Sequence, residues 1–130
     1  MDPKYILDID ELDSQHQEIE TIFLSLQDAL EDKLRWNKLI ETLYEKLKFH
    51  FYAEESIMQI FAYPEIQEHK NAHHKMLKTV ESYKEIDLSD LEVEKLKEQQ
   101  LIQLFFEQIL YQDMRFAEFF KRNKGRLGIQ

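Results

Sequence analysis

The sequence predicts an all-α protein, an up-down-up-down antiparallel four-helix bundle that follows a short N-terminal arm. Three observations predict this fold. The chain holds only two glycines and two prolines in 130 residues, and a shortage of residues that break helices favours long helices. Hydrophobic residues make up 43% of the chain, and in four stretches they recur at alternating spacings of three and four, as on the inward face of a bundle helix. The segments between these stretches are short, so consecutive helices are expected to run antiparallel.

The composition limits the classes of function. A chain of 130 residues is expected to form one domain, 1–130, with a core of its own. The formal net charge of −9 argues against nucleic acid as a partner. The absence of cysteine excludes disulfides, thiolate zinc sites and cysteine-ligated iron–sulfur clusters. No apolar run resembles a secretory signal or could span a bilayer, so we expect a cytoplasmic protein with no membrane partner.

The first helix is predicted to follow an arm of residues 1–12. Ser14 and Gln17 have the spacing of a capping box, which would start the helix there. The inward residues of this helix are expected to be Leu12, His16, Ile19, Phe23, Leu26 and Leu30. A histidine therefore occupies a core position.

The second helix is predicted after a connection around Glu31–Lys33. Its inward residues are expected to be Trp36, Ile40, Leu43, Leu47, His50, Glu54, Ile57 and Phe61. A carboxylate within an apolar stripe is costly unless it is paired or bound to a metal. Pro64 is expected to end this helix and to suit the first turn of the next one.

The third helix carries two inward histidines, and its inward residues are expected to be Ile66, His69, His73, Met76, Val80 and Tyr83. The neighbouring His74 is expected to face solvent.

The fourth helix is predicted to begin at a capping box of Ser89 and Glu92, with Leu88 and Val93 as its hydrophobic staple, and to run to about Phe120. A basic tail, 121–130, follows it. The inward residues of this helix are expected to be Ile102, Phe105, Ile109, Asp113, Phe116 and Phe120. Gln108 precedes Asp113 by five residues, about 140° of rotation, so the two polar groups would flank Ile109 and could reach one site.

Antiparallel threading of these helices places the inward polar residues in one layer of the bundle. They are His16, His50, Glu54, His69, His73, Asp113 and the flanking Gln108. A lone inward histidine is more often a hydrogen-bonded core residue, but a metal-free core with this whole set would need every member to find a partner among the others. Imidazole and carboxylate ligands suit iron, zinc or manganese. Two carboxylates that bridge two cations would be an economical arrangement.

These residues resemble the hemerythrin family, and bacterial single-domain hemerythrins in particular. The matching signatures are Ile9, Leu12-Asp13-Ser14-Gln15-His16, His50-Phe51, Glu54-Glu55, Met58, Tyr63-Pro64, His69, His73 and Asp113. The resemblance implies two non-haem iron ions joined by an oxo or hydroxo bridge, and dioxygen as the ligand. By position, His16 and His50 would be terminal ligands of one iron, His69 and His73 of the other, and Glu54 and Asp113 would bridge the pair. The dioxygen pocket would be lined by Phe51, Phe105 and Ile109.

One position departs from the family pattern, because Gln108 stands where the family normally has a fifth terminal histidine. Gln108 could ligate iron through its oxygen, leave the place to a water, leave one iron loosely bound, or donate a hydrogen bond to a ligand in the pocket. The leading hypothesis is a dioxygen-binding protein for storage, delivery or scavenging. The alternatives are a di-iron oxidase, peroxidase or nitric-oxide-reactive enzyme that uses the altered site, and an oxygen or iron sensor or iron buffer. The sequence indicates no protein partner.

Overall fold

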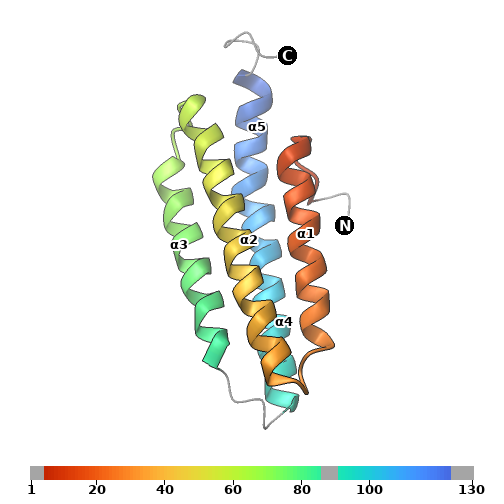
Figure 1. Ribbon diagram of the computed structural model, residues 1–130. Coiled ribbons are helices and arrows are strands. Elements are labelled where there is room, and N and C mark those ends of the chain that lie inside the picture. The colour runs from red at the N-terminus through yellow and green to blue at the C-terminus, as the bar shows by residue number, and fades with distance from the viewer. Residues whose placement is uncertain (1–4, 86–90, 124–130) are drawn as a thin grey trace.

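The fold is all-helical, with four antiparallel helical rods, in a computed structural model that describes residues 5–85 and 91–123. The first three rods are α1 (Asp10–Gln27), α2 (Lys33–Ile60) and α3 (Ile66–Ser82), and a short 3₁₀ turn, η2 (Tyr83–Glu85), follows α3. The fourth rod consists of α4 (Leu91–Gln108), a π-helical turn, η3 (Ile109–Asp113), and α5 (Met114–Asn123). Figure 1 shows these last three elements as one continuous rod behind α2. The predicted four-helix bundle is therefore confirmed.

The rods pack in chain order, because α1 contacts α2, α2 contacts α3, α3 contacts α4, and α4 returns to α1. This arrangement encloses two apolar clusters at different heights. The larger cluster includes Ile19, Leu47 and Phe105, and the smaller one includes Leu12 and Met58. On α1, His16 lies between Leu12 of one cluster and Ile19 of the other. The inward polar residues thus form a layer with apolar packing above and below.

The predicted inward stripes agree with the observed burial. Most of their members are buried, and the partly buried ones lie towards the ends of the stripes: Ile57, Ile66, Tyr83, Ile102 and Phe120. His74 is exposed, as predicted. Among the described helices, none is both long enough and apolar enough to cross a membrane.

The start of α1 corrects the sequence analysis. The helix begins at Asp10 rather than near Ser14, so Ser14 is a helix-interior residue and the predicted capping box is wrong. Three acidic residues in the first turn favour this earlier start, because they face the positive end of the helix dipole. Asp13 also accepts a hydrogen bond from the Leu7 amide at 2.8 Å, which holds the preceding segment against the helix.

The start of α2 has a side-chain cap, whereas the start of α3 at Glu65 has none. Asp32 precedes α2 and accepts a hydrogen bond from the Arg35 amide at 3.1 Å, as an N-cap residue does. The predicted capping box of the fourth helix falls partly on Leu88 and Ser89, which lie outside the described residues.

The fourth rod also differs from the prediction of one continuous α-helix. The Met114 amide bonds to the Ile109 carbonyl, an i→i+5 bond that marks a π turn. In a π turn, residues five apart come to nearly the same face. Gln108 and Asp113 therefore do not lie about 140° apart, as the α-helical spacing predicted. The widened turn lies where the rod contributes Asp113 to the inward polar layer.

The end of α2 is fixed by backbone geometry rather than by Pro64 alone. The Tyr63 amide bonds to the Met58 carbonyl at 2.9 Å and the Ala62 amide to the Gln59 carbonyl at 3.1 Å, which is the Schellman pattern. Ala62 has a φ of 53°, the left-handed conformation in which a side chain is unfavourable.

Replacing Ala62 by glycine is expected to raise the free energy of unfolding by about 1 kcal/mol, because glycine has no Cβ to strain in this conformation. Urea unfolding of the metal-free protein measures the change. Ala72→Gly, within α3, is the matched control and is expected to lower the free energy of unfolding by about 1 kcal/mol. A fall in stability for both variants would contradict the prediction.

Candidate metal centre

Six polar side chains converge in the middle of the bundle from all four rods. They are His16 of α1, His50 and Glu54 of α2, His69 and His73 of α3, and Asp113 of η3. None of them is more than 2% exposed. The helical periodicity produces this convergence, because residues three or four apart on each helix face the same direction.

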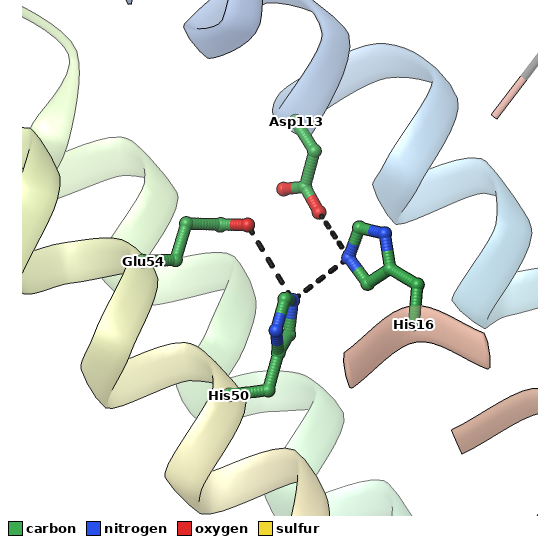
Figure 2. A group of neighbouring side chains, drawn as sticks. All are labelled: His16, His50, Glu54 and Asp113. Atoms are coloured by element: carbon green, nitrogen blue, oxygen red, sulfur yellow. Dashed lines mark hydrogen bonds and ion pairs between the residues drawn. The ribbon is translucent and has the colours of Figure 1, made fainter. Parts of the chain in front are cut away.

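The six side chains form two groups that could each hold a metal ion. One group is His16, His50, Glu54 and Asp113, and the other is Glu54, His69, His73 and Asp113. Within each group, one ligand atom from every residue lies within 4.8 Å of the others. The two groups share both carboxylates and differ only in their histidine pairs. Figure 2 shows the first group, in which the four side chains point toward one another.

In the first group, the two imidazoles meet through the same ring atom. His16 Nε2 lies 2.8 Å from His50 Nε2 and 3.3 Å from Asp113 Oδ2. His50 Nε2 lies 3.5 Å from Glu54 Oε2. Figure 2 marks these three contacts. Both Nε2 atoms therefore face one point between the helices.

In the second group, His69 lies between the two carboxylates. Its Nε2 is 2.6 Å from Glu54 Oε1 and 2.7 Å from Asp113 Oδ1. His73 Nε2 lies 3.0 Å from the same Glu54 oxygen. Each carboxylate thus presents one oxygen to the His16–His50 pair and its other oxygen to the His69–His73 pair. This division of oxygens is what a carboxylate needs in order to bridge two ions.

The cluster has strongly perturbed protonation equilibria. Burial by itself would raise the pKa of Glu54, but the three histidines at ion-pair distance outweigh burial and hold that pKa well below its usual value. Burial would lower the pKa of His69, but the contacts with Asp113 and Glu54 prevail and raise it to about 10. The pKa of His73 is raised for the same reason, by Glu54 and Glu55 against the effect of burial. The carboxylates therefore stabilise positive charge on the histidine rings beside them.

The residues present fit a bound cation. Both Glu54 oxygens and His73 Nε2 are enclosed and form no hydrogen bond within the described part of the chain, although they lie at ion-pair distance. Buried polar atoms rarely remain without hydrogen bonds, and a metal ion would satisfy them. Four imidazoles and two carboxylates form a donor set suited to iron, zinc or manganese.

The hydrogen bonds at the Nδ1 atoms of two histidines also support the fit of a bound cation. His50 Nδ1 lies 2.7 Å from Gln15 Oε1, and His73 Nδ1 lies 2.7 Å from Glu55 Oε2. Both partners are acceptors, so each Nδ1 carries the proton and donates it. In the neutral ring, the lone pair is then on Nε2, the atom that faces the cluster, as a metal-ligating histidine requires.

Neither outer partner was predicted as a site residue. Gln15 and Glu55 lie within the motifs that resemble the hemerythrin family, but the sequence assigned them no role. The one sequence signal is that each adjoins an inward polar residue, since Gln15 precedes His16 and Glu55 follows Glu54. Their contacts cross between helices, so the period of a single helix does not reveal them.

The three predicted wall residues are buried, and two of them, Phe51 and Phe105, contact histidines of the cluster. Phe51 stacks on His73 with ring centroids 3.8 Å apart and an interplanar angle of 6°. Phe105 meets His16 edge-on at 6.0 Å, and Ile109 is fully buried. Phe51 and Phe105 thus place apolar rings beside His73 and His16. Their role toward dioxygen stays a prediction.

Gln108 is the residue directly before the π turn. Its side chain is partly buried, and its amide nitrogen is enclosed and makes no hydrogen bond to any described residue. Gln108 thus has an unused hydrogen-bond donor one π turn from Asp113.

A comparison with known protein families matches residues 7–120 to the hemerythrin HHE cation-binding domain. The chain belongs to the hemerythrin family. Neither a comparison with curated proteins nor one with solved structures gave a match. The predicted family is confirmed, and the buried histidine–carboxylate cluster lies in a hemerythrin-like cation-binding domain. The closer resemblance to bacterial single-domain hemerythrins, and the interpretation of Gln108 as a substitute for a ligand histidine, stay predictions.

Proposed function

We propose that this hemerythrin domain holds two non-haem iron ions with an oxo or hydroxo bridge and binds dioxygen, for storage, delivery or scavenging. The observation that carries the proposal is the pair of four-residue groups that share Glu54 and Asp113. Two histidines for each ion and two shared carboxylates would serve a pair of iron ions. When bound, such a pair supplies the electrons that dioxygen takes up.

The six site residues would be divided between the two ions according to their positions. His16 and His50 would hold one ion, His69 and His73 the other, and the carboxylates of Glu54 and Asp113 would bridge them. The apolar clusters on both sides exclude water from the layer. Exclusion of water strengthens the electrostatic interactions within the site and suppresses side reactions of a bound ligand.

Iron-loaded, reduced protein is expected to develop a visible charge-transfer band on exposure to air, and the band is expected to vanish on deoxygenation. Absorption spectroscopy through repeated cycles tests this expectation, together with metal analysis of the purified protein for two irons per chain. Irreversible bleaching on the first exposure would contradict dioxygen carriage.

A second function, turnover of peroxide or nitric oxide, is favoured by one observation at Gln108. Its enclosed amide nitrogen has no hydrogen-bond partner among the described residues, and we infer that it donates to a ligand in the pocket. If Gln108 replaces a ligand histidine, the iron beside it also gains an open coordination position.

Under this second function, the protein is expected to turn over peroxide steadily with a reductant, and Gln108→His is expected to abolish the turnover by restoring an imidazole ligand. The assay compares the two proteins at equal iron content. Equal turnover in both, or none in either, would contradict the proposed enzymatic role.

A further inference from the structure

The two groups of the metal centre have the same kinds of inner ligand, but the hydrogen-bond partners of their outer histidine nitrogens differ. Each group offers two histidines and the same two carboxylates. Behind His50 the acceptor is the neutral amide oxygen of Gln15, and behind His73 it is the carboxylate of Glu55. The two distances are both 2.7 Å, so the contacts differ in charge rather than in length.

The charge difference acts directly on the inner ligand atoms. A carboxylate that accepts a hydrogen bond from Nδ1–H polarises the ring and raises the electron density at Nε2. The ring then becomes a stronger ligand for a cation. An amide oxygen orients the ring in the same way but contributes no net charge. The Glu55 side chain is 25% exposed, and His73 is 2% exposed, so the contact is only partly screened by solvent.

Resting on the proposed two-ion centre, we propose that Glu55 and Gln15 are positioning residues that make the two metal positions unequal. The position at His69 and His73, supported by Glu55, binds divalent metal more tightly and fills first. The position at His16 and His50, supported by Gln15, fills second. The chain thereby loads its two ions in a fixed order.

Zinc tests this order because it is redox-inert and diamagnetic. Metal-free protein is titrated with zinc against a competing chelator, and NMR of ¹⁵N-labelled histidine identifies which rings respond. The first equivalent is expected to shift the ring signals of His69 and His73, and the second those of His16 and His50. The two dissociation constants are expected to differ by about tenfold or more.

Two isosteric exchanges separate charge from shape. Glu55→Gln keeps a hydrogen-bond acceptor but removes the charge, and it is expected to weaken the tighter position about tenfold. Gln15→Glu adds a charge behind His50 and is expected to tighten the weaker position by a similar factor. The double variant is expected to invert the loading order, which a merely structural role of either residue would not produce.

Glu45→Gln is the matched control, because Glu45 is an exposed carboxylate on the same helix as Glu55, ten residues or about 15 Å away along the axis. It removes the same charge and is expected to leave both constants unchanged. An equal effect of Glu45→Gln and Glu55→Gln would overturn the inference, and so would a first equivalent at His16 and His50. If the two zinc dissociation constants are equal and neither Glu55→Gln nor Gln15→Glu changes them, this inference alone is overturned. A protein that binds neither zinc nor iron would overturn the proposed function as well.

Discussion

Replacing Glu54 by glutamine is expected to abolish the binding of two metal ions. Glu54, like Asp113, meets the histidines of both groups, with one oxygen at 3.5 Å from His50 and the other at 2.6 Å from His69. Glutamine keeps one oxygen and the shape of the side chain, but its amide nitrogen cannot act as the second ligand oxygen. The change also removes one negative charge from a buried site that would hold two cations.

We expect Glu54→Gln to retain at most one ion per chain, and its affinity for that ion to fall about 100-fold, the upper end of what a lost partner at a metal site costs. Metal analysis and competition with a chelator measure the two quantities. Glu45→Gln, the same exchange at an exposed position of α2, is expected to keep two ions at unchanged affinity. Two ions in Glu54→Gln, at an affinity within threefold of the starting protein, would refute the bridging role.

Metal binding is expected to stabilise the folded protein strongly. The ligands come from α1, α2, α3 and η3, so the site does not exist in the unfolded chain, and the binding free energy adds to the folding free energy. Free ion at 1,000 times its dissociation constant contributes about 4 kcal/mol. For a domain of this size, that corresponds to a rise in Tm of about 10–15 °C.

Two adjacent histidines of α3 provide a matched pair for this prediction. His73 is buried in the cluster, whereas His74 is exposed and faces away. Anaerobic thermal melts with ferrous iron are expected to show the full rise in Tm for His74→Ala and most of it lost for His73→Ala, and a chelator is expected to reverse the rise. An equal rise in both variants would mean that iron binds elsewhere on the molecule.

Helical periodicity carried much of the site prediction. Because an α-helix turns by a fixed angle per residue, the spacing of His50 and Glu54, or of His69 and His73, already places each pair on the apolar face of its own helix. The structure confirms that these residues and His16 are buried. Their assembly into one layer followed from antiparallel threading, because short connections set helices side by side.

Two predictions from the sequence pattern were wrong. One failed because the backbone departs from the ideal α-helix, and the other because acidic residues start α1 before the predicted capping box. A π turn uses one residue more than an α turn, so the angle expected between Gln108 and Asp113 was wrong. Acidic residues of the first turn started α1 before Ser14, although Ser14 and Gln17 have capping-box spacing.

The inward residues of the site, the bundle and the family could all be predicted from the amino-acid sequence. The packed helices were needed to show which oxygen of Glu54 and Asp113 faces which histidine pair, and that Gln15 contacts His50 while Glu55 contacts His73. This difference arises because periodicity fixes the direction of a side chain around its own helix. The rotation and height of one helix against another depend on how the whole core packs, and contacts between helices depend on both.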